Sequence, residues 1–195
     1  MNLYLFNETR RGAVYGVGAY IRELTAALKD REINLCVVNL YTDKPQILRE
    51  EIEGVGYWYF PAPIPEQRII DFQKQCELYY NNVAYLLQLY IADKNNLIFH
   101  LNYMNCQPLA DSLRMIFNCK TVLAVHYLDS VMTLRGNVSR LRRIIYENDD
   151  LSDAEEKSAK NFFTKEKEFF HAADKIICLS NHTFNILHQD YQMRT

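Results

Sequence analysis

The sequence of 195 residues has no apolar run long enough to cross a bilayer. Its longest apolar stretch, residues 83–92, is interrupted by Gln88, whereas a membrane-spanning helix needs about 20 apolar residues. An excess of one charge is also missing, because 22 Lys and Arg are balanced by 24 Asp and Glu. No overall positive field is therefore available to attract nucleic acid. We expect a chain that neither spans a membrane nor binds nucleic acid.

Cysteine pairs with the spacing of a disulfide framework or a zinc ribbon are absent. The five cysteines are odd in number, and no two of them are separated by two residues. His182 and His188 also lack the spacing of metal ligands, so no metal site is expected. The first eight residues lack the basic start of a signal peptide. A reducing, cytoplasmic compartment is the simplest interpretation.

What the sequence does contain is the balance of an ordinary globular protein. Hydrophobic residues make up 49% and charged residues 24%, which excludes disordered, collagen-like and coiled-coil chains. A chain of 23.0 kDa buries about 70% of its unfolded surface, which is enough for one core and too little for two full domains. We therefore expect a single domain over residues 1–195.

Apolar runs typical of strands alternate with helical periodicity along the chain. Strands are expected at residues 3–6, 35–38, 57–60, 97–99, 121–125 and 175–179. Helices are expected at residues 15–28, 66–93, 108–117, 152–170 and 180–187. A capping box at Ser152 and Glu155 opens the fourth helix, and Ser180 caps the fifth. Residues 42–56 are charged and contain Pro45, which predicts a loop.

These strands are continuously apolar, as strands covered on both faces are. Strands separated by helices indicate a parallel sheet. The predicted fold class is therefore α/β, with a doubly wound, mainly parallel, Rossmann-like sheet and helices on both faces.

Ligands of such sheets bind beyond the carboxyl ends of the strands. Polar residues follow the apolar runs there, and the candidates for binding a donor or acceptor are Gly16, Gly18, Asn102, Tyr103, Ser180 and Arg11. Gly16 and Gly18 lie where a strand meets a helix, and glycine there leaves helix N–H groups accessible to an anion or hydroxyl. Ile21 occupies the third glycine position of a dinucleotide fingerprint, so that motif is absent. A tight turn with no ligand is the alternative.

His126 follows four apolar residues at the end of a predicted strand. A histidine there can donate a hydrogen bond to a substrate or move a proton near neutral pH. Asp129 could orient it, or could simply cap the following turn. The alternative for His126 is a side chain satisfied by neighbouring backbone.

A basic run follows, from Arg135 through Arg140, Arg142 and Arg143. It could meet a phosphate or the anionic face of a membrane, or it could be a solvated helix face.

Several segments together resemble the amino-terminal half of GT-B glycosyltransferases, and most closely the large retaining group called family four. They are residues 12–28 with Tyr-Gly-Val-Gly-Ala-Tyr-Ile-Arg-Glu-Leu, residues 97–102 with Leu-Ile-Phe-His-Leu-Asn, residues 121–126 with Thr-Val-Leu-Ala-Val-His, and residues 173–180 with Ala-Asp-Lys-Ile-Ile-Cys-Leu-Ser. Their order and spacing run through nearly the whole chain.

The resemblance implies an acceptor-binding Rossmann-like domain from an enzyme of bacterial polysaccharide synthesis. A second domain, absent from this chain, would hold the nucleotide-sugar, which is a co-substrate, and no cofactor is implied. By the same resemblance His126 contacts the transferred sugar, and the acceptor is a glycan or a lipid-linked molecule at the inner membrane face.

Two other interpretations stay open. The chain could be a self-contained nucleotide- or phosphate-binding module without catalysis. It could also be a protein-interaction domain that uses residues 57–60 or the region of Arg140.

Overall fold

The computed structural model describes residues 1–9, 16–64, 71–102, 106–147, 151 and 153–193. Seven strands lie within these residues: β1 (Asn2–Glu8), β2 (Asn34–Thr42), β3 (Leu48–Ile52), β4 (Val55–Pro61), β5 (Leu97–Leu101), β6 (Cys119–Val125) and β7 (Lys175–Cys178). Seven helices lie there too: α2 (Val17–Leu28), α3 (Phe72–Tyr90), α4 (Gln107–Ile116), α5 (Asp129–Thr133), α6 (Val138–Tyr146), α7 (Ala154–Ala172) and α8 (Asn181–Gln189).

The strands form one sheet in the order β3-β4-β2-β1-β5-β6-β7. β1 pairs in parallel with both β2 and β5, and β2 pairs in parallel with β4. From β1 the sheet continues to β2 and β4 on one side and to β5, β6 and β7 on the other, as in doubly wound sheets. The predicted α/β class with a mainly parallel, Rossmann-like sheet is confirmed.

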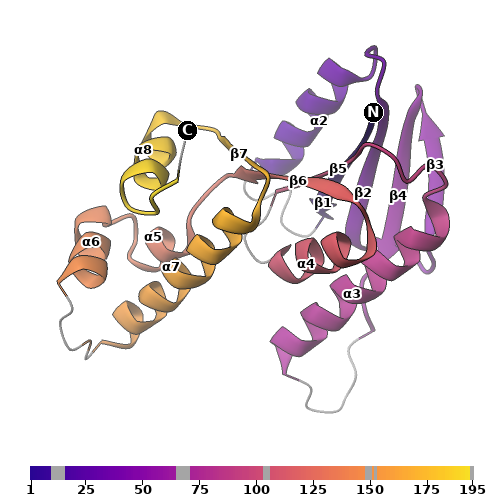
Figure 1. The fold of residues 1–195 in the computed structure, drawn as a ribbon. Coiled ribbons are helices and arrows are strands. Elements are labelled where there is room, and N and C mark those ends of the chain that lie inside the picture. The colour runs from indigo at the N-terminus through magenta and orange to yellow at the C-terminus, as the bar shows by residue number, and fades with distance from the viewer. Residues whose placement is uncertain (10–15, 65–70, 103–105, 148–150, 152, 194–195) are drawn as a thin grey trace. The chain divides into compact units, whose positions relative to one another are not determined.

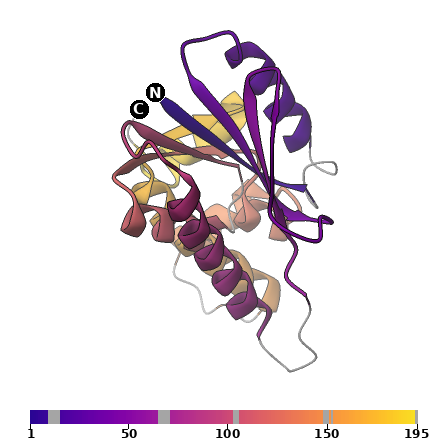
Figure 2. The ribbon, with the colours of Figure 1, turned by 90° about the vertical axis from the view of Figure 1, so that its right-hand side faces the viewer.

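The chain divides into two compact units, Met1–Val122 and Leu123–Thr195. In the first unit, α2 lies on one face of the sheet, and α3 and α4 lie on the other (Figures 1 and 2). Trp58 of β4 packs on Tyr90 of α3 with ring centroids 4.8 Å apart. Its neighbours Tyr57 and Tyr59 face α2, because side chains alternate along a strand.

In the second unit, α5, α6 and α7 share a small apolar core. Its fully buried members are Leu134, Leu141, Ile144 and Ala159. Next to α5, the Tyr191 hydroxyl donates to Glu166 of α7, and the backbone N–H of Ser130 donates to the other carboxylate oxygen at 3.3 Å. The hydroxyls of Ser130 and Tyr191 lie 2.8 Å apart. Burial raises the pKa of Glu166 to about 7.

The prediction of a loop over residues 42–56 is wrong, because β3 lies within it. β3 pairs antiparallel with β4 through a tight turn in which Glu53 and Gly54 both have positive φ, 52° and 76°. Such turns match the twist of a hairpin. The apolar pattern is missing because β3 is an edge strand, and its Arg49, Glu50 and Glu51 are exposed.

Two smaller expectations are also corrected. The first strand extends through Asn7 and Glu8, because both residues continue the pairing of β1 with β2. The N-cap of α7 is Asp153, whose carboxylate accepts from the N–H of Glu155 at 2.9 Å, while Ser152 lies outside the described residues. The cap predicted at Ser180 is confirmed.

The buried carboxyl of Glu166 should make stability fall as the pH rises. This group titrates near 4.5 in the unfolded chain and near 7 in the folded one, so between these values the folded chain binds more protons. The free energy of unfolding is expected to decrease by about 3 kcal/mol across this window. Urea denaturation from pH 4.5 to 7.5 should show this decrease in the wild type and a flatter profile in Glu166→Gln. Equal slopes in the two proteins would contradict the assignment.

Candidate functional site

Gly16 is the residue at which the first unit needs a glycine. Its φ is +71°, in the left-handed region that side chains disfavour, and it is the N-cap of α2. No described side chain caps this helix, and its first turn holds no acidic residue. The helix therefore begins with N–H groups that a hydroxyl or anion could accept from. Gly18, in the first turn of α2, lines a pocket between α2 and the sheet.

Asn102, directly after β5, has a structural bond. Its Nδ2 donates to the backbone oxygen of Phe6 at 2.9 Å, and the residue is only 1% exposed. This bond ties the carboxyl ends of β1 and β5 together. Two residues earlier, buried His100 places Nε2 3.3 Å from the hydroxyl of Tyr20 on α2.

A buried carboxylate lies at the carboxyl end of β1, where sequence reasoning assigned no role. Glu8 is 3% exposed and accepts a hydrogen bond from the Tyr80 hydroxyl of α3. Burial raises the pKa of Tyr80 above its usual range. Beside it, Tyr41 has a positive φ of 53° and stacks on Tyr79 at 4.2 Å. Tyr79 and Tyr80 are buried, whereas Tyr85 is exposed.

In the second unit, His126 follows β6 and is half-buried. Burial lowers the pKa of His126 below its ordinary value of 6.5, so its imidazole is neutral at pH 7. A neutral imidazole carries one donor and one acceptor nitrogen. Asp129 is the first residue of α5, where the helix dipole favours a carboxylate.

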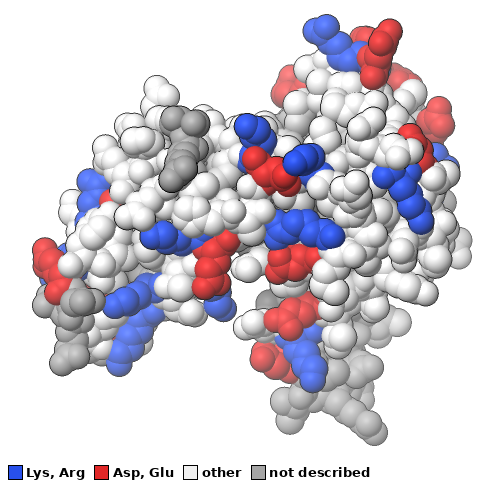
Figure 3. Space-filling model, in the orientation of Figure 1, with Lys and Arg blue, Asp and Glu red and all other residues white. Residues whose placement is uncertain are grey.

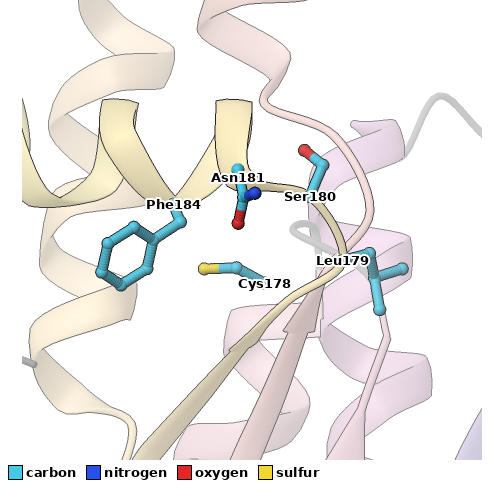
Figure 4. A pocket seen from close by; sticks show the side chains of 5 residues that line it. All are labelled: Cys178, Leu179, Ser180, Asn181 and Phe184. Carbon is cyan, nitrogen blue, oxygen red and sulfur yellow. The ribbon is translucent and has the colours of Figure 1, made fainter.

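Ser180 caps α8. Its Oγ accepts from the N–H of Thr183 at 3.1 Å and lies 3.0 Å from that residue's Oγ1. Around it is a pocket of about 410 Å³, in which Cys178 and Phe184 lie on one side of the chain and Leu179 on the other (Figure 4). β6 and β7 are neighbours joined by a helical connection, as parallel strands are. His126 and Ser180 therefore follow adjacent strand ends.

The candidates thus divide between the units. Gly16, Gly18 and Asn102 belong to Met1–Val122, and His126, Asp129 and Ser180 belong to Leu123–Thr195. Arg11 and Tyr103 lie outside the described residues. In the part of the chain that the structure describes, no group of three or more His, Cys, Asp or Glu residues could hold a metal ion. None of the helices described is long and apolar enough to cross a membrane.

The arginines of the basic run form ion pairs on the second unit. Arg140 donates to Asp153, Glu155 and Glu156 at 2.6–2.8 Å, which fastens α6 to the start of α7. Arg142 binds Asp190, just after α8, at 3.0 Å. Lys and Arg side chains are interspersed with Asp and Glu on the face shown in Figure 3. The run therefore bridges helices within the unit.

No protein-family model matches the sequence, and no curated protein matches it either. Among solved structures, the chain is similar to sucrose-phosphate synthase from Thermosynechococcus elongatus, with a TM-score of 0.66 and 17% sequence identity. The match covers 97% of this chain and 45% of that chain. The two proteins share a fold over nearly all of the present chain, which spans less than half the length of the synthase.

Arg142 is expected to matter for stability because Asp190, its partner, has only 3% of its side chain exposed. Arg142→Ala leaves this buried carboxylate without its cation, which is strongly unfavourable. Thermal denaturation should show Tm falling by several degrees, at least ~4 °C. Arg135→Ala is the matched control, since 90% of the Arg135 side chain is exposed and its ion pair is long, at 3.9 Å. Equal Tm values for the two variants would contradict this role.

Proposed function

We propose that this chain is the acceptor-binding half of a glycosyltransferase. The observation that carries the proposal is the fold shared with sucrose-phosphate synthase over 97% of the chain. The ordered segments that resemble retaining GT-B enzymes support it independently, because they depend on residue identity and the likeness of folds does not. In this proposal a second, nucleotide-sugar-binding domain follows Thr195. The 45% coverage of the synthase is consistent with such a domain.

The proposed reaction moves a sugar from a nucleotide-sugar to a hydroxyl of a glycan or lipid-linked acceptor, with retention. The bond from the anomeric carbon to the phosphate oxygen breaks, and a bond from that carbon to the acceptor oxygen forms. The acceptor proton passes to the departing phosphate, which leaves as the nucleotide. No further reactant is required. The oxocarbenium-like charge of the transition state is stabilised electrostatically.

His126 is proposed to hold the transferred sugar by accepting a hydrogen bond from a sugar hydroxyl at the unprotonated nitrogen of its neutral imidazole. Its half-buried position after β6 and the lowered pKa of its side chain support this role. Ser180 would act through the backbone at the start of α8, where it would help to bind the ligand. Its own hydroxyl oxygen already accepts a hydrogen bond from the N–H of Thr183. Gly16 would let a ligand approach the start of α2.

A lipid-linked acceptor would bring the enzyme to the cytoplasmic face of a membrane through the acceptor itself. The arginine run is not needed for that contact, because Arg140 and Arg142 are paired with carboxylates.

Replacing His126 tests the proposal in the protein encoded by the complete reading frame. Release of nucleotide from UDP-, GDP- and ADP-sugars is measured with neutral oligosaccharide acceptors. His126→Ala should lower kcat/KM about 100-fold or more without changing Tm. The control is His171→Ala, at the exposed carboxyl end of α7. Unchanged turnover in His126→Ala would refute its role. Tight nucleotide binding without transfer in the wild type would favour a non-catalytic binding module.

The pH dependence gives a second test of His126. Burial lowers the pKa of this side chain, so the acid limb of kcat/KM should lie below pH 6.5, where protonation removes the acceptor nitrogen. His126→Asn keeps a hydrogen-bond acceptor, its amide oxygen, and does not titrate. The variant should lose the limb while retaining more activity than His126→Ala. An acid limb that persists unchanged in His126→Asn would assign it to another group.

A further inference from the structure

The outer side of α3, in the first unit, is apolar and uncharged where a surface helix normally carries charge. From Leu78 to Tyr90 the helix contains no Asp, Glu, Lys or Arg. Leu78, Tyr85 and Leu89 are 48%, 58% and 64% exposed. Helices at a protein surface usually present charged and polar residues to water, with their apolar residues facing the core. The proposed transfer reaction uses none of these side chains.

The exposed residues lie in one line along the helix. Asn82 is exposed as well, and the four residues Leu78, Asn82, Tyr85 and Leu89 are separated by four, three and four positions. At 3.6 residues per turn these spacings keep all four within an arc of about 60°. The same spacing forms the contact line between two helices of a coiled coil. We call these four residues the α3 seam.

The neighbouring helix extends this surface. α3 and α4 lie side by side on the same face of the sheet (Figures 1 and 2). The Oγ of Ser112 on α4 donates to the Oδ1 of Asn81 on α3 at 2.5 Å. Met115, one turn further along α4, is 87% exposed. The apolar surface therefore includes the α3 seam and Met115 beside it.

The α3 seam is complementary to a second copy of itself. Its residues are symmetric about the point midway between positions 83 and 84. When two α3 helices pack antiparallel about a two-fold axis through that point, Leu78 meets the partner's Leu89, and Asn82 meets the partner's Tyr85. Each pair then occurs twice, as the contacts of a two-fold dimer must. The amide of Asn82 can form a hydrogen bond with the hydroxyl of the partner's Tyr85.

The charges around the α3 seam favour a second copy over a membrane surface. A helix that lies on an anionic bilayer places Lys and Arg beside its apolar side. α3 has neither after Lys74, and Arg114 on α4 forms an ion pair with Asp111 at 2.6 Å. An uncharged seam can approach its own copy without the repulsion that a surface of one sign would cause.

The exposed apolar area is sufficient for a reversible dimer. With about 200 Å² for a whole tyrosine side chain and about 100 Å² for a leucine or methionine, Leu78, Tyr85, Leu89 and Met115 together expose about 300 Å². About 60% of an interface is apolar, so this area corresponds to about 1,000 Å² in total for two partners. Specific interfaces begin near this size, and those at the lower end are weak.

We propose that the α3 seam joins two copies of this chain in a reversible dimer with antiparallel α3 helices. Leu78 and Leu89 form the two apolar ends of the contact, and Asn82 and Tyr85 fix its register between them. A polar residue within an apolar seam has this effect in coiled coils. The inference concerns self-association and does not depend on the transfer reaction.

Sedimentation velocity of the full chain, from low micromolar to submillimolar concentration, tests the proposal. The average mass should rise from 23.0 kDa toward twice that value, with a Kd in the micromolar range. Leu89→Glu places a carboxylate against the partner's Leu78 at both ends and should weaken the dimer at least about 30-fold. Its Tm at low concentration should equal that of the wild type, because Leu89 is exposed in the single chain. The matched control is Ile52→Glu on β3, 49% exposed, which should dimerise like the wild type.

A double variant tests the antiparallel pairing itself. In Leu78→Lys combined with Leu89→Glu, each introduced ammonium faces an introduced carboxylate of the other copy. The dimer should therefore recover at least about tenfold in Kd relative to Leu89→Glu alone. Parallel helices would instead place like charges opposite each other at both positions, and no recovery would follow.

Four results would overturn the proposal. They are a mass of 23.0 kDa at every concentration, a dimer whose Kd is the same in Leu89→Glu, a double variant that does not recover, and a monomer that binds phosphatidylglycerol vesicles unless Leu89 is replaced. The last result would assign the α3 seam to a membrane surface. None of these measurements contains a sugar donor or acceptor, so their outcome and that of the transfer assay are independent.

Discussion

The central constraint on this fold is the burial of β1 on both faces. All of its residues except Asn7 are buried, and it pairs in parallel with β2 on one side and β5 on the other. A strand buried in this way needs helices above and below it, and parallel neighbours need crossovers that provide them. The bond from Asn102 to the oxygen of Phe6 then holds β1 and β5 together at the edge where ligands of such sheets bind.

The same constraint explains how far the fold could be predicted from sequence. Apolar runs located six of the seven strands, and with them the α/β class, whether the strand is buried almost throughout, as β1 and β2 are, or partly exposed, as β4 and β7 are. The exception, β3, is an edge strand whose Arg49, Glu50 and Glu51 are exposed. Its sequence therefore has no apolar run that would predict a strand. Its signal was the tight turn at Gly54. The chain shares 17% identity with a synthase of similar fold over 97% of its length, so most side chains can differ while the fold is kept.

Site residues were harder to predict, because a polar residue at the end of a strand can make a structural hydrogen bond as readily as it can bind a ligand. Asn102 and Ser180 were selected by position, and the structure gives each a local hydrogen bond. Arg140 was noticed for its charge, and its carboxylate partners are 13–16 residues away in sequence, beyond any local pattern. The Oγ1 of Thr25 on α2 is the only buried side-chain oxygen or nitrogen of the described residues that lacks a hydrogen bond, and it had no sequence signal at all. Only the packing of α2 reveals it, because a threonine in a sequence indicates neither burial nor a missing hydrogen-bond partner.

Burial shifts the pKa values of Glu166 and His126, two titrating groups of the second unit, in opposite directions. It raises the pKa of Glu166 and lowers that of His126, so low dielectric favours the neutral form of each. Acidification therefore protonates Glu166, which stabilises the fold, and also charges His126, which removes its acceptor nitrogen. Rising pH restores His126 and ionises Glu166. The stability that protonated Glu166 contributes and a function that needs neutral His126 therefore change in opposite directions with pH.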